Sequence, residues 1–408
     1  MTTASDAVVV GGGPVGAFTA WNLARLGVSV AVFEEHDEVG IPSHCAGHLS
    51  IRGLKTLGLG NLPRGIVENT YSGANVYSAK GTKFSIRMQK PVTCAINRVL
   101  FDKFLIEKAS KAGASVALNS RVKSLVVKNG AVAGVNLERQ SGEEKQSEAK
   151  VVVDCEGISS KLVRQAGLSA LSGQELVYGV EAELENVEDV VSDEVGVYLG
   201  KDYAPGFYAW LMPRRDGTAK VGLAATRRNP KQLLQRFISK HPVASKQFSR
   251  AKVTQMTFHA ISLGGPIART YANGFLVVGD AASQVKPTTG GGVVFGLTCA
   301  RIAAEVVAEA VRRKDFSSIC LQQYQDRCSS RLGFDFRTML SARRFIYSLS
   351  DRKIDSALRF STKFKLDEAL RDVDEIDLQG QTLLKTAVKP ALLAGFAYFL
   401  LLYLTANP

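Results

Sequence analysis

Short apolar runs alternate with amphipathic stretches at the start of the chain. Residues 7–10 are Ala-Val-Val-Val and residues 28–33 form a second apolar run, and a helical pattern lies between them from about Val15 to Leu26. Apolar β-branched runs joined by a helix are typical of parallel strands with a crossover connection. We therefore expect an α/β fold that begins with a Rossmann-like βαβ unit.

A different pattern interrupts this unit. After a helix over residues 96–112, segments 116–118, 121–127 and 131–137 alternate as short strands, and Asn129-Gly130 is a hairpin signal. Another apolar strand, 150–154, follows. Four more strand-like segments then suit an antiparallel sheet with an Asp216-Gly217 turn: 178–184, 194–199, 206–212 and 219–225.

The first pattern returns at residues 274–282, where an apolar strand ends in Gly279-Asp280 and Gly290 to Gly292 open a long helix through Arg312. The sequence therefore predicts a Rossmann-like domain with an inserted antiparallel β-sheet domain and a helical C-terminal region. We expect four segments: 1–170, the first part of the nucleotide-binding domain; 171–265, a β-rich substrate domain; 266–315, its second part; and 316–408, helices with an apolar tail.

The turn after the first strand carries Gly11, Gly13 and Gly16 at G-x-G-x-x-G spacing. Gly11 allows the tight turn, Gly13 lets the backbone approach a pyrophosphate, and Gly16 lets the helix pack closely on the strand. The helix N-terminus attracts phosphate. Glu34 ends the second strand about eighteen residues beyond Gly16 and is placed to accept ribose hydroxyls.

Composition narrows the setting. The chain has 408 residues, of which 46% are hydrophobic and 22% charged, as expected for a globular protein of two or three subdomains. The first strand begins after a few polar residues without a secretory signal, so we expect a cytoplasmic protein. Residues 36–48 hold three histidines and Cys45, but neither they nor the six scattered cysteines have metal-site spacing, so we expect no metal.

The net charge of +13 calls for a partner. Residues 337–365 contain eight Lys or Arg and two Asp, interleaved with apolar residues. Such a segment suits anionic lipid headgroups, an acidic redox protein, or a plain solvated helical face. No nucleic-acid motif accompanies it, so we expect no nucleic acid partner.

The chain ends in a nearly all-apolar segment, 391–404. About fourteen residues are too short to span a bilayer at a rise of roughly 1.5 Å per residue. The segment is therefore either a buried core helix or an anchor that lies in the membrane interface.

Three separated stretches resemble the FAD-binding signature of the p-hydroxybenzoate hydroxylase type of flavoprotein: Gly11 to Gly16 with Glu34, Asp154 to Gly157, and Gly279 to Gly292. Arg98 matches the family position on the flavin side. With the glycine motif, the resemblance implies FAD as cofactor, bound by Gly11, Gly13, Pro14, Val15, Gly16, Glu34, Glu35, Cys45, Ala46, Gly47, Arg98, Val122, Asp154, Gly157, Gly279, Asp280, Pro287, Gly290, Gly291 and Gly292.

Within that superfamily, two segments resemble the geranylgeranyl reductase family. Residues 205–213 match its P-x-x-Y-x-W-x-F-P motif with Met212 in place of Phe, and residues 43–47 match its cysteine loop. The resemblance implies saturation of geranylgeranyl chains in archaeal-type ether-lipid precursors. It gives Cys45 as a catalytic residue and Pro205, Tyr208, Trp210 and Pro213 as substrate-binding residues. His44, as a second catalytic residue, and His48 are candidate proton relays because they lie close to Cys45 in the sequence.

No second dinucleotide motif is evident, so we expect a soluble electron donor, which is a ferredoxin, a deazaflavin or a nicotinamide. From the basic segment and the apolar tail, we expect peripheral association with the membrane. Two other functions share the cofactor pattern. Residues 208–213 have some likeness to the halogenase W-x-W-x-I-P pattern, which would indicate a monooxygenase or halogenase of an aromatic substrate. The other is a non-catalytic flavin-binding membrane scaffold or sensor.

Overall fold

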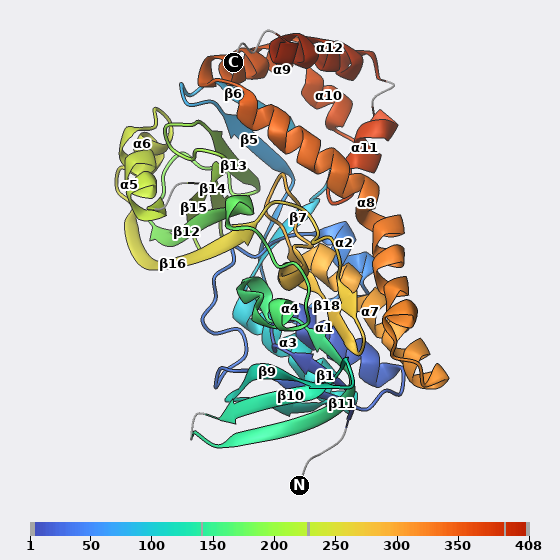
Figure 1. Cartoon of the computed structure of the whole chain (residues 1–408). Helices are drawn as coiled ribbons and strands as arrows, with labels where there is room; N and C mark the ends of the chain where they lie inside the picture. The colour runs from blue at the N-terminus through green and yellow to red at the C-terminus, as the bar shows by residue number, and fades with distance from the viewer. Residues whose placement is uncertain (1–4, 140–141, 227–228, 387–388, 405–408) are drawn as a thin grey trace. The chain divides into compact units, whose positions relative to one another are not determined.

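The computed structural model describes residues 5–139, 142–226, 229–386 and 389–404 (Figure 1). The chain divides into two compact units, each built from three segments. Unit 1 consists of residues 1–43, 98–175 and 262–336. Unit 2 consists of residues 44–97, 176–261 and 337–408.

Unit 1 contains the expected parallel sheet. Its strand order is β17-β18-β11-β1-β2-β8, and β18, β11, β1, β2 and β8 run parallel. The strands are β1 (Ser5–Val10), β2 (Val30–Phe33), β8 (Ser115–Ala117), β11 (Glu144–Asp154), β17 (Tyr271–Ala272) and β18 (Phe275–Val277). The prediction of an α/β fold from the apolar runs is therefore confirmed.

The two faces of this sheet are covered differently. Helix α1 (Pro14–Arg25) packs against α3 (Arg98–Lys111) and α7 (Val293–Arg313), and Gly16 of α1 faces Val9 of the sheet. On the other face, Val8 and Val10 are buried with residues of β9 (Ser120–Lys128), β10 (Ala131–Arg139) and α4 (Lys161–Gln165). β9 and β10 turn at Asn129 and Gly130, whose φ angles of 52° and 75° are those of the predicted hairpin.

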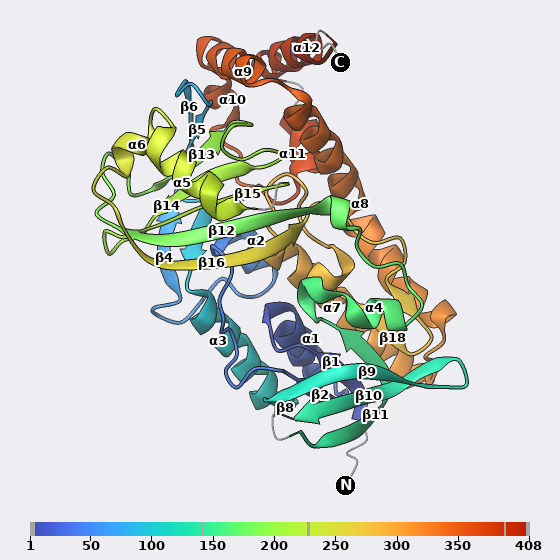
Figure 2. The same cartoon turned by 60° about the vertical axis from the view of Figure 1, so that its left-hand side comes forward.

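Unit 2 is built on a seven-stranded sheet with the order β16-β12-β15-β14-β13-β5-β6. In Figure 2, β12 and β16 run side by side along its edge. The strands are β5 (Gly73–Tyr77), β6 (Lys83–Arg87), β12 (Leu176–Glu185), β13 (Glu194–Leu199), β14 (Tyr208–Pro213), β15 (Ala219–Ala225) and β16 (Lys252–Ser262).

The placement of residues 44–97 differs from the sequence expectation. We expected them within the first part of the nucleotide-binding domain, whereas they belong to unit 2. The physical reason is the parallel pairing of β5 with β13, in which Gly73 lies opposite Glu194. Local sequence patterns carry no signal of a pairing over so many residues.

The two faces of the seven-stranded sheet have different neighbours. Val180, Ala209, Val221 and other residues of one face are buried against α5 (Pro230–Lys240) and α6 (Ala244–Gln247). The alternate residues of these strands point to the opposite face. There, Trp210 and Met212 pack in a hydrophobic cluster with residues of a three-stranded sheet. This sheet consists of β3 (His48–Ser50), β7 (Thr93–Ile96) and β4 (Val67–Tyr71), and α2 (Ile51–Thr56) follows β3 in the chain.

The C-terminal region is helical, with α8 (Ser318–Ser348), α9 (Asp351–Lys363), α10 (Leu366–Leu370), α11 (Gln379–Thr386) and α12 (Pro390–Leu404). One side of α12 packs, because Leu402 is buried with Leu349 and Ile354. On another side, Leu393 and Leu401 are 54% and 55% exposed. The apolar tail is therefore part core and part surface. Among the described residues, no helix combines the length and apolarity that crossing a membrane requires.

Candidate functional site

The turn between β1 and α1 has the close contacts that its glycines predict. Gly11 has a φ of 96°, and a Cβ on it would lie 2.6 Å from the Cys155 carbonyl oxygen. A Cβ on Gly16 would lie 2.0 Å from the Gly11 carbonyl oxygen. At Gly13, by contrast, a Cβ would meet no atom within 4 Å, and this residue caps α1 without a side chain. The helix N-terminus is therefore open to a ligand's phosphate.

Glu34 lies beside this turn, as expected. Its Oε2 accepts a hydrogen bond of 2.6 Å from the Gly12 amide, and its Oε1 accepts one of 3.0 Å from the His36 amide. These bonds fix the carboxylate at the end of β2. Glu35 instead has an exposed side chain that pairs with Arg121, and Val122 packs at the edge of the core.

Asp154 ends β11 next to Val10 of β1 and is fully buried. Its Oδ1 accepts a hydrogen bond of 3.0 Å from the Glu156 amide, whereas its Oδ2 is buried without a hydrogen-bond partner in the structure. Burial raises the pKa of Asp154, and the nearby Glu156 raises it further. A buried unsatisfied oxygen is a group that a bound ligand can satisfy. Gly157, three residues on, takes a φ of 71° in a short 3-10 turn.

A second glycine turn follows β18. Gly279 has a φ of 76°, and its amide donates to Gln284. Gly290 to Gly292 lead into α7 as expected, after the buried Pro287, and a Cβ on Gly292 would lie 2.7 Å from Oδ1 of Asp280. Asp280 is exposed to solvent, although surrounding protein atoms remove part of the hydration of its carboxylate. Its pKa is raised by burial and lowered by Arg98.

Arg98 begins α3 and is held by Asp102 through two contacts, of 3.1 Å from Nε and 3.0 Å from Nη2. Both side chains are largely buried. Burial raises the pKa of Asp102, and the charge of Arg98 lowers it. Arg98 and Asp280 both belong to unit 1, and the charge of Arg98 lowers the pKa of Asp280.

These groups fit a dinucleotide. They gather at the carboxyl ends of β1, β2, β11 and β18, where open α/β sheets bind ligands. An uncovered Gly13, a helix N-terminus, the fixed Glu34 carboxylate and the unsatisfied Asp154 oxygen suit phosphates and sugar hydroxyls. Within the described residues, no group of three or more His, Cys, Asp or Glu is arranged to hold a metal ion.

The cysteine loop belongs to unit 2. Gly47 has a φ of 72°, and its carbonyl accepts a hydrogen bond of 2.9 Å from the Ile96 amide, which ties the loop to β7. Cys45 is half-buried and His44 is exposed. The ring of His48 meets Tyr71 edge to face at 5.6 Å.

Unit 2 also holds the predicted substrate residues. The Tyr208 and Trp210 rings lie edge to face, 6.0 Å apart, on one side of β14, as their spacing predicts. Trp210 covers Gly222, where a Cβ would lie 2.3 Å from its Cζ2. The carbonyl groups of Pro205 and Pro213 accept hydrogen bonds from neighbouring segments, so both prolines help to fix this region.

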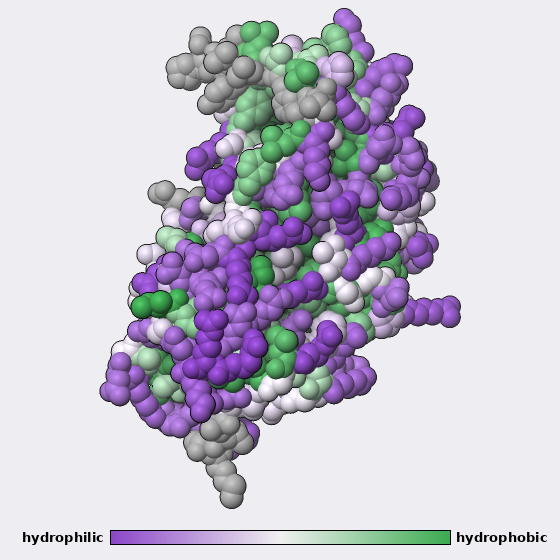
Figure 3. Space-filling view, turned by 90° about the vertical axis from the view of Figure 1, so that its right-hand side faces the viewer, coloured by the Kyte–Doolittle hydropathy of each residue, from purple (hydrophilic) through white to green (hydrophobic). Residues whose placement is uncertain are grey.

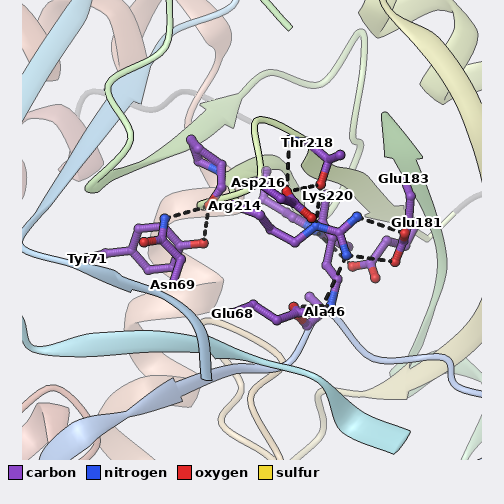
Figure 4. A network of polar contacts seen from close by, with 12 residues as sticks. Ala46, Glu68, Asn69, Tyr71, Glu181, Glu183, Arg214, Asp216, Thr218 and Lys220 are labelled. Atoms are coloured by element: carbon purple, nitrogen blue, oxygen red, sulfur yellow. Dashed lines mark hydrogen bonds and ion pairs between the residues drawn. The ribbon is translucent and has the colours of Figure 1, made fainter. Parts of the chain in front are cut away.

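A buried polar network adjoins the cysteine loop (Figure 4). Nζ of Lys220 donates to Oε2 of Glu68 at 3.1 Å and to the carbonyl oxygen of Ala46 at 3.3 Å. Nε1 of Trp210 donates to Oε2 of Glu181 at 3.3 Å. Burial raises the pKa of Glu181 to about 7, although Lys220 opposes the shift.

The sequence analysis missed this network. Its signal was a charged residue at an inward position of an apolar strand, as with Lys220 in Ala-Lys-Val-Gly-Leu and Glu181 in Val-Glu-Ala. Lysine and glutamate are almost never fully buried unless they are paired. The partners lie on other strands and in a loop, so the pattern alone could not name them.

Comparison with known proteins identifies the class. Residues 4–332 match the model of the FAD binding domain family. The chain is 33% identical over 391 residues to digeranylgeranylglycerophospholipid reductase 2 of Methanopyrus kandleri, covering 94% of this chain and 95% of that one. It is 32% identical over 395 residues to digeranylgeranylglycerophospholipid reductase of Methanocaldococcus jannaschii, covering 96% and 97%.

Solved structures agree. A geranylgeranyl bacteriochlorophyll reductase-like protein from Thermoplasma acidophilum has a TM-score of 0.86 and 27% identity, covering 98% of this chain and 100% of that one. A flavin-dependent brominase has a TM-score of 0.70 at 21% identity, covering 88% of this chain and 93% of that one, and shares the fold. The chain is thus an FAD-dependent oxidoreductase. It belongs to the digeranylgeranylglycerophospholipid reductase family.

The position of Glu34 predicts a defined loss of cofactor affinity. Glu34→Gln keeps the side-chain shape but removes the charge that a sugar hydroxyl would meet. We expect the FAD dissociation constant to rise about tenfold, as for one lost charge-assisted hydrogen bond. Flavin fluorescence titration of the apoprotein measures it. Glu107→Gln, an exposed acid on α3, is the matched control, and equal affinities for the two variants would contradict the assignment.

The raised pKa of Glu181 predicts a pH-dependent stability. Its pKa is about 7 in the folded protein against 4.5 in a model peptide, so the folded state holds the proton more tightly. The stabilisation is full below about pH 4.5 and is lost as the pH rises toward 7. In urea unfolding, the free energy of unfolding of the wild type should fall by roughly 3 kcal/mol across this pH range. Glu181→Gln should not show this decrease. Glu185→Gln on the same strand is the control, and an unchanged slope in Glu181→Gln would refute the prediction.

Proposed function

We propose that this protein saturates the carbon–carbon double bonds of geranylgeranyl chains in ether-lipid precursors. The observation that carries the proposal is its similarity, over almost the full length of both chains, to relatives named digeranylgeranylglycerophospholipid reductase. The reaction adds a hydride to one carbon and a proton to the other, so the protein must bind a reductant, hold an apolar chain and deliver a proton.

The cofactor residues proposed for unit 1 follow from its two glycine turns. Gly11, Gly13 and Gly16 leave the pyrophosphate against bare backbone, and Glu34 accepts the ribose hydroxyls. Asp280 and Arg98 serve the flavin half of the cofactor. Reduced FAD, when bound, supplies the hydride.

In unit 2, we assign the apolar chain to Tyr208 and Trp210. Their rings present a wide apolar surface beside the Met212 cluster. Met212 replaces the phenylalanine of the family motif, and its flexible side chain adapts to a chain of irregular shape. Cys45, half-buried in the adjoining loop, is the proposed proton donor.

The proposed electron donor is a soluble carrier, which is a ferredoxin, a deazaflavin or a nicotinamide. The exposed basic residues of α8 and α9 support the first of these, because acidic redox proteins dock on basic surfaces. Arg343 and Lys353 of the basic segment are partly buried and donate to the carbonyl groups of Gly206 and Leu402, so they serve the fold instead.

The activity is tested directly without the natural donor. The protein is reduced with dithionite under anaerobic conditions, a geranylgeranyl glycerophospholipid is added, and flavin absorbance and lipid mass are followed together. We expect reoxidation of the flavin with a gain of two hydrogens per double bond. Reduced flavin that ignores the lipid but reacts rapidly in air to hydroxylate an aromatic compound would indicate a monooxygenase instead.

The role of Cys45 has its own test. Cys45→Ser should slow lipid-dependent reoxidation by about 100-fold, the lower range for losing a general acid, and should leave bound FAD unchanged. Cys320→Ser, which changes a free cysteine of α8 outside the predicted FAD-binding stretches, is the control. Full turnover by Cys45→Ser would exclude the assigned role.

We also propose that the C-terminal helices bind the membrane surface. Exposed apolar residues lie on α11 and α12 and at the end of α9. The exposed basic residues Arg352, Lys363 and Lys365 lie on α9 or directly after it. Figure 3 shows hydrophobic groups at the end of the molecule where Figure 1 draws these helices. The apolar residues are Phe364, Leu383, Leu384, Leu393 and Leu401. Such a surface can bind an interface without crossing it.

Vesicle co-sedimentation measures this binding. The double variant Leu393→Asp and Leu401→Asp should bind vesicles containing anionic lipid at least about tenfold more weakly than the wild type, because two charges replace exposed apolar groups that would enter the membrane interface. Ile319→Asp, at a position 83% exposed on α8, is the control for an apolar surface residue elsewhere. Equal binding by the double variant and the control would argue against the proposal.

A further inference from the structure

Lys220 occupies an unusual position for a lysine. It lies within β15 between Ala219 and Val221, and its side chain is only 6% exposed. A buried ammonium group loses most of its hydration, and this loss is tolerated only where charged and polar partners replace the water. The groups that contact the Lys220 ammonium therefore indicate which part of the structure this buried charge stabilises.

Its first partner is the cysteine loop. Nζ donates to the carbonyl oxygen of Ala46 at 3.3 Å, one residue after Cys45. The loop is also tied down at Gly47, through the hydrogen bond from the Ile96 amide. Ala46 and Gly47 thus give the loop two anchors, one from a side chain and one from the backbone, and Cys45 lies directly before both.

Its second set of partners is acidic. Nζ donates to Oε2 of Glu68 at 3.1 Å, and its charge also acts on Glu181. Glu181 accepts a hydrogen bond from the indole Nε1 of Trp210. The charge of Lys220 therefore acts on the carboxylate that holds the Trp210 ring. Figure 4 shows Lys220 extending between Glu68 and Ala46.

Arg214 belongs to the same network but has different contacts. It pairs with Glu183 at 2.8 Å and Glu68 at 3.5 Å, and its side chain is 11% exposed. Its other side-chain hydrogen bond is to Thr218. The structure therefore offers two largely buried cations that share Glu68, one bonded to the cysteine loop and one bonded to Glu183 of β12 and to Thr218.

We propose that Lys220 is a positioning residue that fixes the Cys45 loop through its hydrogen bond to the Ala46 carbonyl. The consequence for catalysis rests on the proposed function. The positional consequence does not, because it concerns a loop and a side chain of the same unit. Without the ammonium group, the loop retains its Gly47 anchor, and Cys45 gains freedom of movement while the sheet stays intact.

The test compares Lys220→Met with Arg214→Met in the FAD-loaded protein. Each variant removes one buried cation from the same network. The first readout is the rate of alkylation of Cys45 by iodoacetamide, resolved by mass spectrometry and referred to Cys155 of unit 1. The second is kcat and KM for the lipid, and Lys220→Arg serves as the conservative variant.

We expect Lys220→Met to raise the Cys45 alkylation rate about tenfold, the factor for one lost hydrogen bond from a charged donor, and to lower kcat more than it changes KM. Arg214→Met should leave the alkylation rate near that of the wild type, and Lys220→Arg should restore it in part. Should Lys220→Met fail to fold, Lys220→Gln decides, because its shorter and uncharged side chain also loses the charged hydrogen bond to the Ala46 carbonyl.

Two outcomes would overturn the proposal. One is an equal rise in Lys220→Met and Arg214→Met, which would mean that the network only stabilises the fold. The other is an unchanged rate in Lys220→Met, or in Lys220→Gln where Lys220→Met does not fold. A rise confined to the Lys220 variants in a protein whose wild type reduces no prenyl lipid would support the positional role and refute the proposed function.

Discussion

No side chain fits at Gly11 or Gly16, in the turn that leads from β1 into α1. A Cβ on Gly16 would lie 2.0 Å from the carbonyl oxygen of Gly11, and one on Gly11 would meet the Cys155 carbonyl at 2.6 Å. This steric constraint brings the helix N-terminus against three strand ends and leaves Gly13 uncovered. The Gly12 amide then bonds to Glu34, so a single turn fixes the anion-binding helix end and the acid beside it.

Unit 2 depends on a different constraint, which is the neutralisation of buried charge. One face of its sheet is apolar and packs on α5, whereas the other carries Glu181, Trp210 and Lys220. These groups are costly to bury, and each has partners among the strands and the cysteine loop. Unit 1 thus supplies bare backbone for a cofactor, and unit 2 supplies a rigid polar frame behind an aromatic surface.

The sequence predicted the parts of this fold that local patterns encode. The apolar runs and the glycine spacing predicted β1, α1 and β2 with Glu34 at its end, and Asn-Gly and Asp-Gly pairs predicted two hairpins. The placement of residues 44–97 was not predictable, because β5 finds β13 only through long-range pairing. Lys220 and Glu68 were missed for the same reason, since their meaning lies in partners from distant segments. The sequence left two alternatives for the apolar tail, a buried core helix or an anchor in the membrane interface. In the structure, α12 has one packed side and one exposed side.

The central proposal is that FAD and the lipid are bound by different residues: FAD by the glycine turns of unit 1 together with the Cys45 loop, and the lipid by Tyr208 and Trp210. Trp210→Leu tests it most directly, by equilibrium FAD titration together with stopped-flow reoxidation of the reduced protein by a geranylgeranyl glycerophospholipid. We expect an FAD dissociation constant that stays near the wild-type value, and reoxidation slower by about 100-fold, the loss expected when a reacting chain is misplaced by about 1 Å. Loss of FAD affinity in this variant, or reoxidation at the wild-type rate, would contradict it.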